Sequence, residues 1–101
     1  MLEPVGTALL AEQLRNGDPE AFSKLLDLYG SSMLRVARGY VSSRDLAEDV
    51  VQETFVVAWR KLPELDLASE SLLPWLATIC RFQSANRMRA QRKDRENAGA
   101  V

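Results

Sequence analysis

The sequence predicts an all-α fold, a compact bundle of a short N-terminal helix plus three longer helices. Apolar residues recur at steps of three and four through three long stretches, which is the period of an α-helix. The residues before those stretches are of the types that begin helices. Runs of β-branched residues are few, and 101 residues suit one small domain.

The first predicted helix is short and covers residues 7–16. Gly17 follows it as a stop signal, because glycine readily adopts the left-handed conformation that ends helices. The residues expected to face the core are Leu10 and Leu14, with Leu9 or Val5 assisting.

The second predicted helix begins at Asp18-Pro19-Glu20 and continues to about Val41. Asp18 is a good N-cap, and Pro19 suits the first helical position. Gly30 costs roughly 1 kcal/mol relative to alanine. It marks either a close approach to a neighbouring helix or a weak point. The apolar face, expected to pack in the core, comprises Phe22, Leu25, Leu26, Tyr29, Met33, Val36, Ala37 and Tyr40.

The third predicted helix opens at a capping box and runs to about Leu62, where Pro63 blocks continuation. In the Ser-Ser-Arg-Asp segment at 42–45, Ser42 is placed to reach forward and Asp45 to reach back. One face is expected to bury Ala47, Val50, Val51, Thr54, Phe55, Ala58 and Leu62. The opposite face carries Glu48, Asp49, Gln52, Glu53, Val56 and Trp59.

The outer face of this third helix is unusual for a solvated surface. Its carboxylates surround a valine and a tryptophan, and no basic residue interrupts them before Arg60. This pattern indicates a docking surface for a basic or amphipathic partner helix. The alternative is that Trp59 folds back onto the edge of the core and the acids are merely solvated. The residue pattern leaves both alternatives open.

An acidic loop over residues 63–70 precedes the last predicted helix. Ser71 is a candidate cap for that helix, and Pro74 falls in its first turn, where a missing N–H does no harm. Cys80 lies at the edge of the buried face as a small core thiol. That face is expected to comprise Leu72, Trp75, Leu76, Ile79 and Phe82.

The last helix becomes basic beyond its first three turns. Residues Arg81, Ala85, Arg89 and Arg92 fall on one stripe, and Gln83 and Asn86 have side chains that can contact base edges. Residues 1–70 carry a net charge of −5 and residues 71–101 a net charge of +4. An acidic body with a basic end indicates two partners of opposite charge, the anionic one being nucleic acid. The alternative for the basic end is a solvated helix terminus that the helix dipole favours.

Composition argues against several classes of function. One cysteine and no histidine exclude an internal disulfide and a Cys/His zinc site in this chain. No glycine-rich phosphate loop is visible, and the clustered carboxylates lie on an exposed face, so we expect neither an enzyme nor a cofactor or metal. No apolar run approaches the ~20 residues of a membrane span, and no signal peptide is visible. We therefore expect a cytoplasmic protein without membrane insertion.

Two segments resemble motifs of one protein family. The segment AEDVVQETF at 47–55, followed by Ala58-Trp59, closely resembles the signature helix of bacterial sigma factors of the extracytoplasmic-function (ECF) group. The segment WLATICR at 75–81 resembles the Trp-Leu-x-x-Ile-Ala-Arg motif that opens the −10-binding helix of that family. The resemblance extends from about Asp18 to Arg95, and the two motifs in this order are fairly specific.

The resemblance implies region 2 of a sigma factor, which binds core RNA polymerase and recognises and melts the promoter −10 element. In the family, the Asp-x-x-Gln-Glu face grips a coiled coil on the β′ subunit. The loop that corresponds to 63–71 helps to form the pocket for a base flipped from the melted −10 element. The polymerase-binding set expected here is Asp49, Gln52, Glu53 and Val56. The set expected to hold the non-template strand of promoter DNA is Arg81, Asn86, Arg89 and Arg92, with Leu67 and Ser69 from the loop.

The chain departs from the family pattern after the second motif. The family usually has Asn directly after the Arg of that motif and Asp four positions later, where this chain has Phe82 and Asn86. Phe82 removes a polar group that often supports the base pocket. It either packs inward or stacks on a base.

Residues 1–96 are expected to form the region 2 domain, and residues 97–101 the start of a flexible linker. The C-terminal domain with which ECF sigma factors read the −35 element is absent, so we expect a promoter-melting domain cut from a longer chain. The resemblance also implies an anti-sigma factor as a partner. The rival interpretation is a helical protein-interaction module without nucleic-acid binding.

Overall fold

The structure is a computed structural model that describes residues 7–65 and 72–99. Within these ranges the chain forms helices and no strand, which confirms the all-α prediction. The helices are α1 (Thr7–Arg15), α2 (Pro19–Arg38), α3 (Arg44–Lys61) and α4 (Leu72–Gly99), with a 3-10 turn η1 (Leu62–Glu64) directly after α3.

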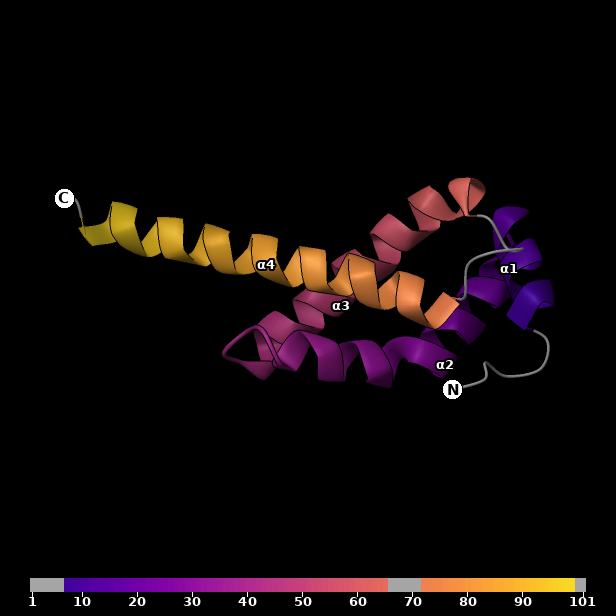
Figure 1. Ribbon diagram of the computed structural model, residues 1–101, viewed down its shortest axis with the longest axis horizontal. Coiled ribbons are helices and arrows are strands. Elements are labelled where there is room, and N and C mark those ends of the chain that lie inside the picture. Colours follow the sequence, from indigo (N-terminus) through magenta and orange to yellow (C-terminus); the bar gives the residue numbers. More distant parts are fainter. Residues whose placement is uncertain (1–6, 66–71, 100–101) are drawn as a thin grey trace.

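The three longer helices pack side by side and α1 closes one end of the bundle. α2 and α3 run antiparallel, and α4 crosses them along the long axis of the molecule (Figure 1). The C-terminal part of α4 projects beyond the turn that joins α2 to α3, so the principal extents are 53 × 24 × 24 Å. The predicted bundle of one short and three longer helices is thereby confirmed.

Helix starts follow the local sequence signals, with one correction. The Asp18 carboxylate accepts from the Glu20 N–H at 3.0 Å as the N-cap of α2, and Gly17 has φ 78°. The predicted cap of α3 at Ser42 is wrong by one residue. Ser43 is the N-cap, and its hydroxyl accepts from the Leu46 N–H at 3.2 Å. Two adjacent serines offer the same chemistry, and only the chain path selects between them.

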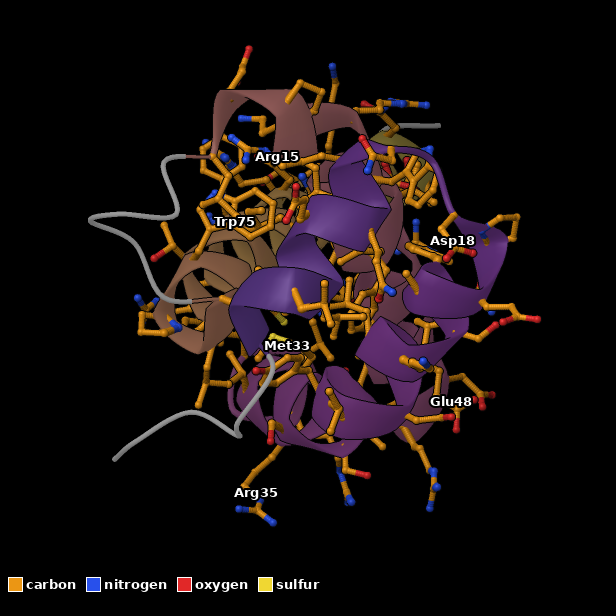
Figure 2. The ribbon with its side chains drawn as sticks, turned by 90° about the vertical axis from the view of Figure 1, so that its right-hand side faces the viewer. Arg15, Asp18, Met33, Arg35, Glu48 and Trp75 are labelled. Carbon is orange, nitrogen blue, oxygen red and sulfur yellow. The ribbon has the colours of Figure 1, made fainter. Side chains whose placement is uncertain are left out.

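The core is built from the predicted apolar stripes, again with corrections. Viewed along the long axis, Met33 lies among the helices, whereas Arg35 and Glu48 point outwards (Figure 2). Four residues that were expected to pack inwards are exposed instead: Leu9, Leu26, Tyr40 and Phe82. Each lies at the edge of the apolar face of its helix, or on a part of the helix surface that no neighbouring helix covers. The buried set comprises Leu10, Leu14, Leu25, Tyr29, Met33, Ala37, Ala47, Val50, Phe55, Ala58, Leu62, Leu72, Leu76 and Ile79, among others.

The single cysteine lies at the contact between α2 and α4. Cys80 is fully buried, and its thiol donates to the Met33 carbonyl at 3.4 Å. Burial raises the pKa of the Cys80 thiol, so the thiol stays neutral at ordinary pH. By contrast, a Cβ built on Gly30 would meet no atom within 4 Å, so Gly30 is a weak point and not a close approach between helices.

The segment after α3 is held against α1, at the end of the bundle that α1 closes (Figure 1). The Arg15 guanidinium donates to the Leu65 carbonyl at 3.1 Å, and the Leu65 side chain is buried. Leu67, Ser69 and the predicted cap Ser71 lie outside the described residues. At the other end of the chain, α4 continues to Gly99, three residues beyond the expected end of the domain at residue 96.

Candidate functional site

The four residues of the predicted polymerase-binding set form one exposed strip along α3. Asp49, Gln52, Glu53 and Val56 are all exposed, and Val56 keeps 41% of its accessible surface. They share this face because positions i, i+3, i+4 and i+7 lie within one sector of a helix. A branched apolar side chain among acidic and amide groups offers both contact area and hydrogen-bond acceptors to a partner.

The tryptophan on this face is anchored at its inner edge. The Trp59 ring meets the Phe22 ring of α2 edge to face, with 5.0 Å between ring centroids and an interplanar angle of 79°. Its exposed fraction is 37%, so one side of the ring still contacts solvent. Of the two alternatives for Trp59, packing on the core edge describes its position.

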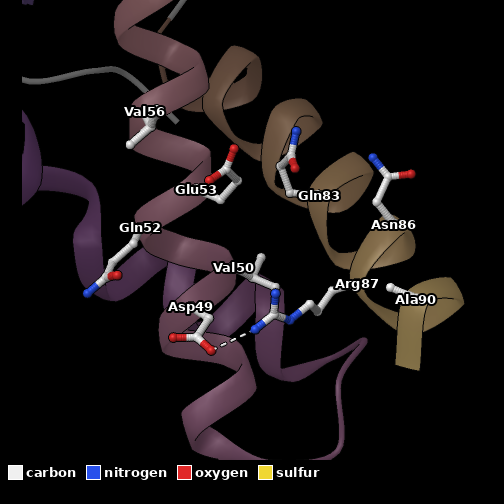
Figure 3. A pocket seen from close by; sticks show the side chains of 9 residues that line it. All are labelled: Asp49, Val50, Gln52, Glu53, Val56, Gln83, Asn86, Arg87 and Ala90. Atoms are coloured by element: carbon white, nitrogen blue, oxygen red, sulfur yellow. Dashed lines mark hydrogen bonds and ion pairs between the residues drawn. The ribbon is translucent and has the colours of Figure 1, made fainter. Parts of the chain in front are cut away.

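The acids of α3 are less isolated than the sequence pattern indicates. Arg44, in the first turn of α3, pairs with Glu48 at 3.0 Å. Arg87 of α4 pairs with Asp49 at 2.8 Å across the space between the two helices (Figure 3). These two pairs leave Glu53 as the carboxylate of the strip for which no ion pair is found within residues 7–65 and 72–99.

A groove of about 550 Å³ lies between α3 and α4 along this strip. Asp49 and Glu53 lie on the side of α3 nearer to α4, whereas Gln52 and Val56 lie on the far side (Figure 3). The wall from α4 is formed by Gln83, Asn86, Arg87 and Ala90. Asn86 belongs to the predicted nucleic-acid set, so residues from both predicted sets line this one groove.

The predicted basic stripe is present on α4. Arg81, Arg89 and Arg92 are exposed, and Arg89 donates to the Asn86 side-chain oxygen. The Arg81 guanidinium donates to the Thr78 hydroxyl at 3.4 Å. The structure therefore brings Arg89 and Asn86 into contact and leaves all three arginines exposed on α4, while Leu67 and Ser69 of the same predicted set lie outside the described residues.

A second hollow, of about 470 Å³, lies between the end of α3 and the early part of α4. Phe82 lines it and keeps 62% of its surface exposed. Arg60 and Lys61 of α3 also line this hollow, beside the apolar Val57 and Ile79. An aromatic face next to two cations is suited to a base and its phosphate.

Three residues that line the groove and the second hollow were not predicted from the sequence to belong to a binding site. No role is predicted from the sequence for Arg87 or Lys61, and Arg60 is named only as the first base after the acidic face. Arg87 falls on the same side of α4 as the core residues Cys80 and Leu76, about two and about three turns later. That helical position was the available signal that its side chain would turn back towards α3.

Within the part of the chain that the structure describes, no helix is long and apolar enough to cross a membrane. The same ranges hold no group of three or more His, Cys, Asp or Glu side chains placed to bind a metal ion.

Comparisons with known proteins agree on one family. The chain matches the profile of the family described as Sigma-70 region 2 over residues 25–94. It is 31% identical over 96 residues to the RNA polymerase sigma factor NccH of Alcaligenes xylosoxydans, covering 95% of this chain and 49% of NccH. It is 32% identical over 91 residues to the ECF RNA polymerase sigma-E factor of Haemophilus influenzae, covering 90% of this chain and 47% of that protein. The chain thus spans about half the length of these curated relatives.

A solved structure extends the likeness to three dimensions. An engineered region 2 of sigmaE, determined by NMR in complex with GTAAAA, superimposes on this chain with a TM-score of 0.82. The sequence identity is 32%, and the match covers 93% of this chain and 97% of the other. Because nearly all of both chains is aligned, the likeness concerns the whole domain.

Proposed function

This chain belongs to the Sigma-70 region 2 family, in its ECF group, and from this premise we propose that it binds core RNA polymerase and recognises and melts the promoter −10 element. The observation that carries the proposal is the close superposition on a sigmaE region 2 that was solved with a bound GTAAAA. The cytoplasm, where promoter DNA and polymerase lie in bacteria, is then the place where it acts. Its role is to bind and position, without catalysis of its own.

The polymerase-binding surface in this proposal is the α3 strip of Asp49, Gln52, Glu53 and Val56. Its acidic and amide groups accept charge-assisted hydrogen bonds from basic residues of the β′ coiled coil. Val56 supplies an exposed apolar contact at the end of the strip opposite Asp49. The exposure of all four side chains supports this assignment, because a docking partner reaches them without any rearrangement of the core.

The non-template strand in this proposal lies along α4. Arg81, Arg89 and Arg92 contact backbone phosphates, which supply most of the affinity and make it dependent on salt. Asn86 contacts a base edge, and the loop with Leu67 and Ser69 borders the site. The hollow at Phe82 takes an unstacked base, whose face lies against the exposed phenyl ring.

An anti-sigma factor is a further proposed partner. Such a protein would cover the α3 strip and hold the domain inactive by excluding polymerase. The rival interpretation, an interaction module without nucleic-acid binding, is not favoured, because it leaves the exposed arginine stripe and the likeness to a nucleic-acid complex unexplained.

Binding to the isolated β′ coiled coil tests the proposal. We expect the native domain to bind, and the double variant Asp49→Ala/Gln52→Ala to lose binding while circular dichroism shows it folded. The matched control is Glu48→Ala, which removes the same single charge one residue away but outside the set. Binding untouched by the double variant would move the interface elsewhere. A folded native domain that does not bind at all would leave the interaction-module interpretation.

A further inference from the structure

The last turns of α4 form a basic helix that stands out into solvent. This arm, residues 88–99, projects past the turn that joins α2 to α3 (Figure 1). Lys93 of the arm is exposed, and its ammonium makes no ion pair within residues 7–65 and 72–99. The arm is therefore a free basic helix on a protein whose body is acidic. Its charged residues are the bases Arg89, Arg92, Lys93 and Arg95 and the acids Asp94 and Glu96.

The groove between α3 and α4 is the complementary surface. Glu53 lines this groove, is exposed, and makes no ion pair with any residue that the structure describes. The acidic face of α3 indicates a basic or amphipathic helix as its partner, and the arm is a helix of that kind. The chain thus carries both a surface that attracts a basic helix and a basic helix, and such complementarity steers two copies together.

The arm of a given copy points away from the groove of that copy. Arg87 of α4 pairs with Asp49 of α3 at 2.8 Å, so these two residues lie at the same level of the bundle (Figure 3). From that level the α3 strip runs towards the α1 end of the bundle, whereas the arm runs the opposite way, because α3 and α4 are antiparallel (Figure 1). The arm that occupies the groove must therefore come from another copy.

We propose that two copies form a closed two-fold dimer in which the arm of each copy lies on the α3–α4 groove of the other. A two-fold axis that crosses α4 at the level of the Arg87–Asp49 pair, and lies over the groove, reverses the direction of one arm and turns it face down onto the other copy. Because the same operation acts on both copies, each arm meets the other groove and the assembly closes. The pair that we assign to this contact is Lys93 of one copy with Glu53 of the other.

The helical positions of the two charges fit this pair. Lys93 follows Asn86 by seven residues and Ala90 by three, so it lies on the side of α4 from which both of these residues line the groove. Along the helix axes, Glu53 lies about 6 Å from the level of the two-fold axis and Lys93 about 9 Å, at 1.5 Å per residue. A lysine side chain spans the remaining difference of about 3 Å.

The dimer has a consequence that rests on the proposed function. It covers the α3 strip, which binds polymerase in that proposal, together with Arg89, which contacts the DNA strand. Two copies therefore block each other, and polymerase has to displace the second copy. The contact is small and charged, so we expect a weak, rapidly exchanging dimer that forms at high protein concentration and low salt.

Sedimentation velocity of the native chain is the first test, and it needs neither polymerase nor DNA. In about 0.01 M salt, where charges act over about 30 Å, the sedimentation coefficient should rise with protein concentration and level off at the value of a dimer. In about 1 M salt, where they act over about 3 Å, the chain should sediment as a monomer. A chain that stays monomeric at low salt, or a dimer that persists at high salt, overturns the proposal.

Exchanging the two charges tests the assigned pair. The variants Glu53→Lys and Lys93→Glu should each remain monomeric at low salt, because each one places like charges opposite each other. An equimolar mixture of the two should form dimers again, since both contacts of the mixed dimer then join opposite charges. Lys24→Glu is the matched control, because it makes the same charge change at an exposed position on α2 and should dimerise like the native chain. Circular dichroism checks that every variant is folded.

The outcomes separate the dimer from the proposed function. Recovery of dimers in the mixture, with a normal Lys24→Glu control, supports the assigned contact. Single variants that still dimerise, or a mixture that stays monomeric, overturn it. The isolated β′ coiled coil should dissociate the native dimer, and a dimer that persists beside a bound coiled coil overturns the mutual blocking. If the coiled coil does not bind a chain that dimerises as described, the proposed function fails and the dimer stands.

Discussion

Replacing Phe82 by alanine should weaken strand binding while leaving the fold intact. The ring is 62% exposed, so truncating it removes few core contacts, and the free energy of unfolding should change by no more than about 0.5 kcal/mol. Stacking of a base on an aromatic side chain contributes about 1–3 kcal/mol, so strand affinity should fall by roughly five- to 150-fold. The assay is fluorescence anisotropy with a labelled mixed-sequence single strand at low salt.

Two control variants sharpen this experiment. Phe82→Leu keeps apolar bulk but removes the aromatic face, so it should lose most of the same affinity. Leu28→Ala truncates another exposed apolar side chain, on α2, and should leave strand binding unchanged. Native affinity in Phe82→Ala would refute the stacking role. A large loss of thermal stability in that variant would show instead that the ring supports the core.

The remaining predictions concern charge, capping and backbone. The double variant Arg89→Gln/Arg92→Gln should reduce the magnitude of the slope of log affinity against log salt concentration by about 1.4, because each phosphate contact to a single strand contributes about 0.7. An unchanged slope would contradict those contacts. Ser43→Ala should destabilise the domain by about 1 kcal/mol in urea unfolding, because it removes the cap of α3. Ser42→Ala should have almost no effect on the same measurement, and equal effects would refute the cap assignment. Gly30→Ala should stabilise by about 0.5–1 kcal/mol, since the new methyl group meets no atom within 4 Å; a lower melting temperature would be the contrary result.

The helices and most of the core were predictable because the capping residues and the apolar periodicity indicated the same helices. Asp18-Pro19 marks the start of α2 in sequence and in structure, and Leu25 and Met33 are buried as their spacing predicts. The same reasoning failed for Leu26 and Phe82, at the margins of their stripes. Periodicity locates a face only to within a residue or so, and the angle at which helices cross decides which marginal residue is covered.

The candidate site was predictable as two sets of exposed residues but not as one arrangement. The acidic strip and the basic stripe each follow from positions on a single helix. The groove that Glu53 and Asn86 both line, and the pair between Arg87 and Asp49, depend on how α4 crosses α3. The residue pattern of one helix does not indicate the angle at which two helices cross. The hollow with Phe82 likewise needs the end of α3 beside α4, which brings Arg60 to it.

Because Cys80 is buried, the rate at which its thiol is modified measures internal motion of the domain. It is the one thiol in the sequence, it lies in the contact of α2 with α4, and burial keeps it protonated. A thiol reagent therefore reacts only when these two helices part, and its rate measures how often they do so. Melted promoter DNA held along α4, or polymerase on α3, should slow that reaction if it tightens the bundle. The time course of a single chemical modification would then show whether binding of the proposed partners also stiffens this domain.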